Sequence, residues 1–508
     1  MNNNTPERTS GTAFRWDAEA DVVIVGYGGA GACAAIAGHD AGVETRILEK
    51  APAGGGNTAT AGPGFTVARD VDAAVEFYRA LTWGTVDEEL LRAMAESTRA
   101  LPGLLEKLGA EVKLLKHKPT WYASFPGADA FQTVHLPRAA GRGGDKTPKI
   151  PGAWLFHLLE NQVRKRGVAV HYQTPATGLV QDPQSREVLG VKAVSDAGKE
   201  ICVKARHGVI LACGGFENNR EMLTQFLPFT VALPIYPMGT PYNTGDGIRM
   251  AGGAGASLWH MTSVEFGNFA PKAPGEKFGL GFRLVRRLPA GGTAIYVNKY
   301  GRRFMDESQL LSHRKEFFRV QAFDTESAEY PNIPFFMVFD EAFRKRGPLV
   351  GRNDSWWNLR DVYRWSDDNS AEIESGWIER ADTINQLAGR INVPPEALEA
   401  TVREYNRACA QKEDTEFGRA REWLVPIESP PFYATELCEP IINTQGGPKH
   451  DARARVLDGE DKPIPRLFAA GELGSMFFPL YLVGGNVPEA LAFGTIAGEQ
   501  AAALAPWD

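Results

Sequence analysis

The segment that most constrains the fold lies near the start of the chain, at residues 21–50, and reads DVVIVGYGGAGACAAIAGHDAGVETRILEK. A β-branched run ends at Val25, the glycine-rich GYGGAG segment follows, and small residues continue to about Gly42. A second apolar run, 45–48, precedes Glu49. Two strand patterns joined by a helix pattern predict a βαβ unit. Its GxGxxG turn, with an acidic residue about 20 positions further on, is typical of dinucleotide binding.

Each glycine of the turn has a separate physical task. Gly26 permits the tight strand-to-helix turn, Gly28 lets backbone amides approach a pyrophosphate, and Gly31 lets the helix pack closely on the sheet. The pyrophosphate is expected at the helix N-terminus, where free N–H groups and the helix dipole favour anions. Glu49 is placed to accept hydrogen bonds from the hydroxyls of the adenosine ribose.

Two further glycine-rich segments point to a longer ligand. Residues 53–64 read AGGGNTATAGPG, and such a run is costly to order unless it wraps a ligand, because glycine loses the most backbone freedom. Near the other end, 466–475 read RLFAAGELGS and 481–486 read YLVGGN, before a small-residue helix pattern that continues to Ala503. An NAD enzyme does not need the second loop, whereas FAD does. The three segments together predict one FAD held by both ends of the chain.

The bulk properties exclude several other classes. A length of 508 residues predicts two or more domains. The net charge of −7 and the lack of a basic run argue against nucleic acid or an anionic membrane as partners. The five scattered cysteines form no metal or haem pattern, and the first twenty residues have no apolar core. We therefore expect a cytoplasmic protein with no metal site, no secretory signal and no membrane span.

In this order, the motifs resemble the fumarate reductase/succinate dehydrogenase flavoprotein family, which includes the 3-ketosteroid dehydrogenases. The resemblance covers about residues 21–503. It rests on GYGGAG (26–31), EK (49–50), GGGNTATAG (54–62), ACGGF (212–216), TGDG (244–247), NKYGRRFMDES (298–308), TQGGP (444–448) and AAGELGS…GGN (469–486). It implies an α/β fold, with a Rossmann-like FAD domain of the glutathione-reductase type and an inserted α+β cap or catalytic domain.

The predicted domain limits follow changes in hydrophobic periodicity and residue composition along the chain. Helical periodicity marks 72–110, 153–166 and 394–412, and from about residue 286 loops rich in tryptophan and proline become frequent. We expect a disordered arm at 1–18, an FAD-binding domain from 19–285 and 438–508, and a cap domain at 286–437.

The resemblance also implies which residues bind FAD. Glu472 is expected beside the ribityl–phosphate part, and the 484–486 segment should open a helix whose N-terminus points at the flavin N1/O2 edge. No histidine stands at 54–64, where membrane-complex relatives attach FAD covalently, so non-covalent FAD is predicted. The predicted cofactor-binding residues are Gly26, Gly28, Gly29, Ala30, Gly31, Glu49, Lys50, Gly55, Gly56, Asn57, Thr58, Ala61, Gly62, Cys213, Gly214, Asn243, Thr244, Asp246, Gly471, Glu472, Gly485, Asn486 and Val487.

The expected substrate pocket departs from that of the dicarboxylate reductases. Those relatives bind acids with two histidines and an arginine and protonate carbon with a second arginine, because arginine pairs with carboxylates bidentately. Here the four positions read about Glu265, Leu311, Asn443 and Leu482. Fumarate or succinate is therefore disfavoured as a substrate, unless arginines such as Arg283, Arg286 or Arg314 substitute.

What stands at the site resembles the ketosteroid dehydrogenase subgroup, whose Tyr-x-x-x-Gly pattern is matched by Tyr481 and Gly485. The tyrosine hydroxyl and the glycine N–H would polarise a ketone, since two preorganised donors stabilise the enolate charge that develops on its oxygen. Hydride from the β-carbon would go to flavin N5, and the reverse reaction would be ene reduction. Alternatively, Tyr481 is a packing residue of the apolar FFPLYL loop.

The proton-transfer residue is left open, because the ketosteroid pattern places a tyrosine near Leu311. His313 and Tyr122 are the candidates, since histidine titrates near neutral pH. A capping or surface role for His313 and a packing role for Tyr122 are the alternatives.

The sequence thus predicts an FAD enzyme acting on a CH–CH bond next to a ketone. Its expected partners are a small-molecule ketone or enone and an external electron acceptor or donor, and its oligomeric state is open. The alternatives are a carboxylate ene-reductase of the fumarate or urocanate type and a flavoprotein electron-transfer subunit without its own substrate.

Overall fold

The structure is a computed structural model, and it describes residues 15–62, 64–116, 122–137, 151–232, 235–267, 269–275, 294–308, 317–350, 363 and 365–507. Among these residues, no helix combines the length and apolar character that a membrane crossing requires. Nor does the described part of the chain contain a group of three or more His, Cys, Asp or Glu side chains placed to hold a metal ion.

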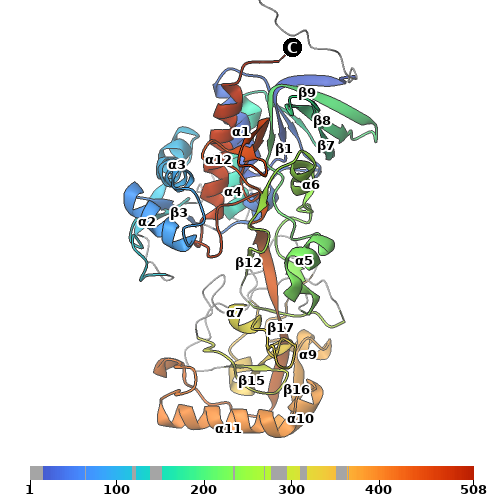
Figure 1. Cartoon of the computed structure of the whole chain (residues 1–508). Coiled ribbons are helices and arrows are strands. Elements are labelled where there is room, and N and C mark those ends of the chain that lie inside the picture. Colours follow the sequence, from blue (N-terminus) through green and yellow to red (C-terminus); the bar gives the residue numbers. More distant parts are fainter. Residues whose placement is uncertain are drawn as a thin grey trace, which may run out of the picture.

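A mostly parallel sheet forms the centre of the upper part of the molecule (Figure 1). Its parallel strands are, in order, β20 (Pro463–Ala469), β9 (Glu200–Leu211), β1 (Ala18–Val25), β2 (Thr45–Leu48) and β6 (Ala169–His171). Antiparallel pairing adds β19 (Arg455–Leu457), β8 (Val188–Val194) and β7 (Ala176–Gln181). The predicted Rossmann-like α/β fold is confirmed.

The register of these strands brings the sequence motifs to one edge. Val25 pairs with both Leu48 and Leu211, and Leu211 pairs with Ala469. The segments that follow these four residues therefore leave the sheet together at its carboxyl edge, where open α/β sheets bind their ligands.

Two helices from opposite ends of the chain cover one face of this sheet side by side (Figure 1): α1 (Gly29–Asp40) and α12 (Asn486–Ala502). Their contact depends on missing side chains. A Cβ at Gly494 would lie 2.3 Å from the Ala30 carbonyl oxygen, and one at Gly498 would lie 2.4 Å from that of Ala34. The small-residue composition of both segments thus fixes their close approach.

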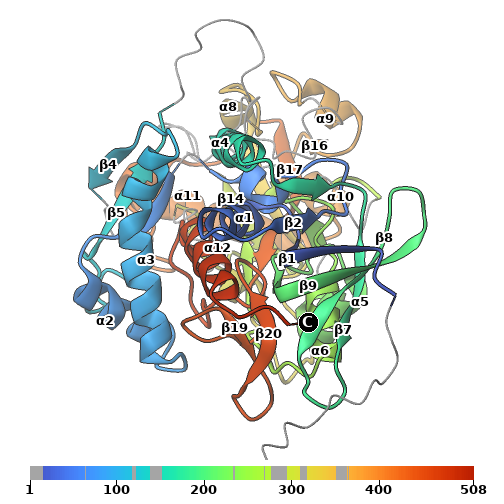
Figure 2. The ribbon, with the colours of Figure 1, turned by 90° about the horizontal axis from the view of Figure 1, so that it is seen from above.

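The remaining helices of this part lie outside that pair. They are α4 (Pro151–Lys165), which contacts α1, and α3 (Glu88–Lys107), which contacts both α12 and α2 (Val71–Leu81). Viewed from above, α2 and α3 lie on the side of α12 away from β7 and β8 (Figure 2). A small antiparallel sheet, β3 (Gly64–Ala68), β5 (Phe131–His135) and β4 (Lys113–Lys116), lies beside α2 and α3 (Figure 2).

A second sheet is built around one long strand, β17 (Phe432–Thr444). Its other strands are β10 (Ile235–Pro237), β12 (Val264–Phe266), β13 (Ala270–Pro271), β14 (Ile295–Asn298), β15 (Phe335–Asp340) and β16 (Glu379–Ala381). Strand β17 passes through the predicted limit at 437/438, and β10, β12 and β13 pair with it from the FAD-domain side of residue 286. The domain limits stay a prediction.

Short helices and one long helix surround this sheet, at the bottom of Figure 1. They are α7 (Phe317–Val320), α8 (Glu341–Arg344), α9 (Ser370–Glu374), α10 (Ile384–Arg390) and α11 (Pro395–Gln411). The connecting region contains α5 (Arg220–Phe226), α6 (Asp246–Gly253) and the two-stranded pair β11 (Leu258–Trp259) and β18 (Gly447–Pro448).

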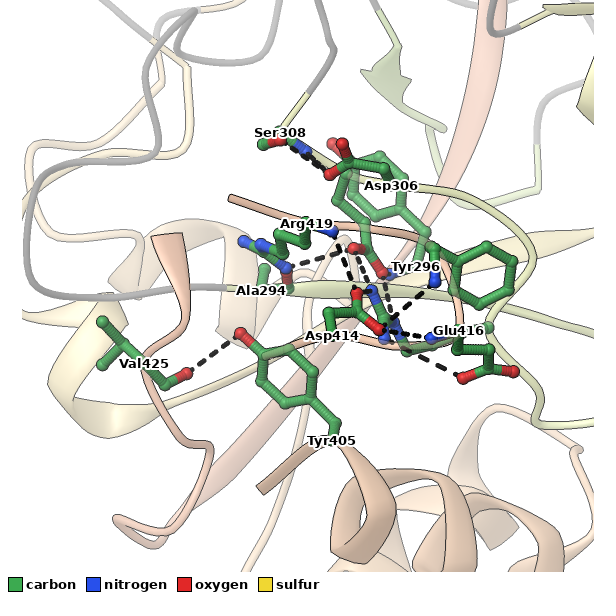
Figure 3. A network of polar contacts seen from close by, with 12 residues as sticks. Ala294, Tyr296, Asp306, Ser308, Tyr405, Asp414, Glu416, Arg419 and Val425 are labelled. Carbon is green, nitrogen blue, oxygen red and sulfur yellow. Dashed lines mark hydrogen bonds and ion pairs between the residues drawn. The ribbon is translucent and has the colours of Figure 1, made fainter. Parts of the chain in front are cut away.

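A buried ionic cluster joins this lower sheet to the segment after α11 (Figure 3). Arg303 donates to both oxygens of Glu307, at 2.9 and 2.8 Å, and to Asp414 Oδ2 at 2.9 Å. Arg419 Nη1 donates to Glu307 Oε2 at 3.1 Å and to the Ala294 carbonyl at 3.0 Å. Two cations and two carboxylates thus neutralise one another away from water.

Candidate active site

A cavity of about 940 Å³ lies at the carboxyl edge of the parallel sheet, at the upper end of the range for ligand pockets. Its wall comes from the segments that follow β1, β2, β9 and β20, from the loop at 51–62, and from the start of α12. The opening and closing motifs of the chain therefore meet around a single space.

The glycines of the first turn divide into two physical classes. Gly26 has a φ of +101°, and a Cβ there would lie 2.3 Å from the Ala212 carbonyl oxygen. A Cβ at Gly31 would lie 2.1 Å from the Gly26 oxygen, so the fold itself requires both glycines. At Gly28, which lines the cavity, a Cβ would meet only the Gly55 oxygen, at 3.7 Å. Gly28 therefore leaves room for a ligand rather than for the protein.

The N-terminus of α1 is only partly occupied by the protein, because the Gly29 N–H donates to Thr58 Oγ1 at 3.0 Å. Its N-cap residue, Gly28, has no side chain to cap the helix, and the first turn contains no acidic residue. Gly28, Gly29 and Ala30 line the cavity, so the positive end of the helix dipole faces it.

The acidic residue after β2 is held by the backbone. Glu49 accepts hydrogen bonds from the N–H groups of Tyr27 and Ala51, both at 2.7 Å. Burial raises the pKa of Glu49, and these two hydrogen bonds oppose the rise. Glu49 lines the cavity and so places a hydrogen-bond acceptor for sugar hydroxyls on its wall.

Lys50 is already paired within the protein. Its Nζ donates to Thr244 Oγ1 at 2.7 Å and to Asp246 Oδ2 at 2.5 Å. The contact ties the end of β2 to the start of α6. Lys50 therefore reaches the cavity wall as half of an ion pair, not as a free cation.

Glu472, on the loop after β20, contacts residues from three other segments. Asn57 Nδ2 donates to its Oε2 at 2.9 Å, Asn243 Nδ2 donates to the same oxygen at 3.3 Å, and the Thr444 N–H donates to its Oε1 at 3.1 Å. The same two amides donate to Glu217 Oε1, at 2.9 and 2.8 Å. The loop at 51–62 is thereby fastened to the closing motif.

The segment before α12 is fixed to the small sheet and places Tyr481 on the cavity wall. Thr66 donates from its N–H to the Gly484 oxygen and from its hydroxyl to the Val483 oxygen, both at 2.9 Å. The Tyr481 hydroxyl accepts the Asn486 N–H at 3.4 Å. Burial raises the pKa of Tyr481, and the negative charge of Glu265 adds to the rise. Tyr481 therefore keeps its proton as a hydrogen-bond donor.

The prediction requires the N–H of Gly485 to point at a substrate ketone in the cavity, and the structure places it elsewhere. It donates to the Leu482 carbonyl oxygen at 2.8 Å, and Gly485 is not among the residues that line the cavity. A Cβ at Gly485 would lie 2.5 Å from Phe477 Cζ, so packing alone demands glycine there. Its catalytic role stays a prediction.

The other two predicted catalytic residues lie off the cavity wall or outside the described residues. The Tyr122 ring stacks on Phe125, with centroids 5.1 Å apart, and Tyr122 is not among the cavity-lining residues. His313 and Leu311 lie outside the described residues.

Most predicted cofactor-binding residues do line the cavity. Four do not: Gly31, Gly55, Thr244 and Gly485. Gly31 supports the turn, and Thr244 positions Lys50. Those on the wall are Gly26, Gly28, Gly29, Ala30, Glu49, Lys50, Gly56, Asn57, Thr58, Ala61, Gly62, Cys213, Gly214, Asn243, Asp246, Gly471, Glu472, Asn486 and Val487.

The sequence reasoning missed several residues that belong to the site. Thr240 lines the cavity, and its N–H donates to Asn57 Oδ1 at 2.9 Å. Gln445 and Asn486 exchange two side-chain hydrogen bonds, at 2.8 and 3.2 Å, which fix the start of α12. Gln445 lies within the TQGGP motif and Glu217 directly follows ACGGF. Their position in or beside a family motif is the sequence signal that could have identified them.

Comparison with known proteins agrees with this geometry. Residues 21–487 match the family model described as FAD binding domain. The chain is 28% identical over 499 residues to the NADH:fumarate oxidoreductase of Klebsiella pneumoniae (strain 342), covering 95% of this chain but only 47% of that protein. It is 27% identical over 587 residues to the 3-oxosteroid 1-dehydrogenase of Mycolicibacterium smegmatis, covering 96% of this chain and 98% of that one.

A solved structure shares the fold across the chain. The 3-ketosteroid delta1-dehydrogenase from Sterolibacterium denitrificans superposes with a TM-score of 0.78 at 24% identity, over 96% of this chain and 99% of that one. The predicted family resemblance is confirmed.

The residues present fit FAD. The first turn leaves space for a pyrophosphate at Gly28, the α1 N-terminus faces that space, Glu49 stands on the wall as an acceptor for sugar hydroxyls, and Glu472 lies on the same wall. Non-covalent binding of FAD stays a prediction.

Proposed function

Because the chain belongs to the FAD binding domain family, we propose that it is an FAD-dependent oxidoreductase that interconverts a ketone and its α,β-unsaturated form. The main support is Tyr481, a protonated hydroxyl on the wall of a cavity assembled from FAD-binding motifs. The full-length match to a 3-oxosteroid 1-dehydrogenase supports the same reaction class.

The proposed chemistry requires a donor at the carbonyl oxygen. Oxidation removes a proton from the carbon next to the carbonyl and a hydride from the next carbon, and a double bond forms between them. FAD, when bound, supplies the two-electron acceptor for this oxidation. The Tyr481 hydroxyl donates to the substrate oxygen, where negative charge develops as the proton leaves. A raised pKa suits this role, because the hydroxyl must donate without losing its own proton.

The proton acceptor is a separate question. Tyr122 would have to turn from its stack on Phe125 to reach the cavity, and His313 remains a candidate on sequence grounds. Both stay predictions.

A carboxylate ene-reductase is the alternative, supported by the match to an NADH:fumarate oxidoreductase, of which the chain spans about half the length. Among the described residues that line the cavity, Lys50 is the only cation, and Asp246 neutralises it. The buried Glu265 helps to raise the pKa of Tyr481 and supplies no positive partner for an acid. A carboxylate substrate needs positive partners, so the ketone is the better fit.

An anaerobic titration tests the proposal. Flavin absorbance is followed while saturated cyclic ketones, including 3-oxosteroids, are added to the oxidised protein, and while enones, fumarate or urocanate are added to the dithionite-reduced protein. Bleaching by a ketone or reoxidation by an enone is expected. Reoxidation by fumarate or urocanate alone would contradict the proposal.

The variant Tyr481→Phe then tests the residue. Loss of one donor to a developing oxyanion lowers kcat by about 100- to 1,000-fold, and FAD binding should be unchanged. Tyr242→Phe is the matched control, because Tyr242 lines the same cavity on the segment before α6. Equal activity loss in the two variants would assign Tyr481 a packing role.

A further inference from the structure

Two carboxyl groups at the cavity wall have an arrangement that the proposed reaction does not use. We propose that Glu217 and Glu472 hold a single proton between them and that this shared proton is required for tight binding of FAD. The two residues come from different segments, after β9 and after β20, and the proposal concerns cofactor binding rather than the substrate.

The two carboxyl groups face each other across Gly215. A Cβ on Gly215 would lie 2.1 Å from Thr444 Oγ1, 2.3 Å from Glu472 Oε1 and 2.8 Å from Glu217 Oε2, so the two carboxyl oxygens and the threonine hydroxyl border the same small space. Their other oxygens, Glu217 Oε1 and Glu472 Oε2, accept from the same two amides, Asn57 and Asn243. Each amide has two N–H groups and gives one to each carboxyl group. The asparagines therefore bridge the pair and hold it together.

One oxygen of the pair is left without a donor. Glu217 is fully buried, and its Oε2 has no hydrogen-bond partner among the described residues. Glu472 Oε1, on the other side of the space, accepts the Thr444 N–H at 3.1 Å and has a further lone pair. A buried carboxylate oxygen without a donor is costly. A proton held between Glu217 Oε2 and Glu472 Oε1 satisfies both oxygens.

The electrostatic surroundings also favour one proton. Burial raises the pKa of both carboxyl groups, and the negative charge of Glu217 raises that of Glu472 further. No cation among the described residues touches the pair: the side chains that face it are the two amides and the Thr444 hydroxyl, and the Thr444 N–H donates to Glu472. The charged groups elsewhere on the wall are Glu49 and the Lys50–Asp246 pair, and the neutral titratable groups are Cys213 and tyrosines 27, 242 and 481.

Only one member of the pair reaches the cavity, so the charge of the pair is felt by a bound cofactor. Glu217 is buried behind the wall, whereas Glu472 is half-buried and lines the cavity. FAD displaces water from this wall and brings a negatively charged pyrophosphate into the same space. A pair without its proton presents two charges there, and a pair with one proton presents one. FAD should therefore bind the singly protonated form more tightly.

The test measures the dissociation constant of FAD for the full chain stripped of flavin, by flavin fluorescence from pH 6 to pH 10. In the wild type, the constant should rise by up to tenfold per pH unit once the shared proton is lost, as expected for one linked proton. In Glu217→Gln the amide N–H replaces the proton permanently, so this rise should disappear. Glu489→Gln, which removes a buried carboxyl group outside the pair, should keep the wild-type rise.

A second measurement needs no variant. Calorimetry of FAD binding to the wild type, in buffers of different ionisation enthalpy, should show proton uptake at the upper end of this pH range and less at its lower end. Parallel pH profiles for the wild type and Glu217→Gln, or no proton uptake by the wild type at any pH, would overturn the proposal. Neither measurement involves a substrate, so the outcome is independent of the ketone chemistry.

Discussion

Among single residues near the cavity, Glu489 is a buried, hydrogen-bonded carboxyl group whose titration affects the stability of the protein. It lies in the first turn of α12 and accepts from the Ser475 hydroxyl at 2.7 Å and from the Met476 N–H at 2.8 Å. Burial raises the pKa of Glu489 to about 7 from its ordinary 4.5, although these bonds oppose the rise. The folded protein thus holds this proton more tightly than the unfolded chain does. The resulting stabilisation is complete below pH 4.5 and is lost as the pH rises through about 7.

The variant Glu489→Gln should lack this pH dependence of stability, so its stability relative to the wild type should change with pH. Because glutamine does not titrate, the variant should gain about 2 to 3 kcal/mol in free energy of unfolding, relative to the wild type, between pH 5 and pH 8. Urea denaturation at the two pH values measures the gain. Glu499→Gln, on the exposed side of the same helix, is the matched control. A Glu489→Gln difference that is the same at both pH values would contradict the prediction.

At the scale of elements, the contact between α1 and α12 joins the two ends of the chain. Gly494→Ala should destabilise the protein by about 1 to 3 kcal/mol, because the added methyl group meets the Ala30 carbonyl at 2.3 Å and the backbone must move. FAD should also bind more weakly, since Ala30 lines the cavity. Thermal unfolding and flavin titration measure the two effects.

Gly252→Ala is the control for that experiment. Gly252 lies in α6, and a Cβ there would meet no atom within 4 Å. Alanine in a helix is favoured over glycine by about 0.5 to 1 kcal/mol, so this variant should be as stable as the wild type or more so. Similar destabilisation by both substitutions would show that the contact with α1 is not the cause.

Elements with a local pattern could be predicted from the sequence. The strand at 45–48 and the helix expected at 394–412 are found as Thr45–Leu48 and Pro395–Gln411. Strand β17 was not anticipated at its length, because its partners are distant in sequence and pairing depends on tertiary contacts. Glu217 was missed for the same reason: its role exists only once Asn57 and Asn243 are brought to it.

For the whole molecule, the buried ionic cluster of Figure 3 is the part of the lower sheet most sensitive to loss of a single charge. The side chains of Glu307 and Arg419 have no exposed surface, and that of Arg303 is 3% exposed. Glu307→Gln removes one of the two carboxylates that neutralise the guanidinium groups, and should cost about 3 to 5 kcal/mol because a buried charge loses its partner. Chemical denaturation measures the loss.

The control for the cluster is at its rim. Glu416 is 61% exposed and lies 4.0 Å from Arg303. Solvent screens such a pair, so Glu416→Gln should change stability by less than about 1 kcal/mol. If Glu307→Gln were equally mild, water or another group would have to replace the lost carboxylate.

Cofactor binding should stabilise segments far from the glycine-rich turn between β1 and α1, because the cavity wall includes both ends of the chain and the end of β17. Ile442 and Asn443 line the cavity, and the next residue, Thr444, donates to Glu472. Ligand binding stabilises the segments it contacts against local opening. Adding FAD to the flavin-free protein should therefore slow amide hydrogen exchange in α1, at the start of α12 and at 441–444. Helix α11 has no residue on the cavity wall and serves as the internal reference. Slowing confined to α1 would mean that the cavity does not close around one ligand, and equal slowing in α11 would mean that the two sheets respond as a single unit through β17.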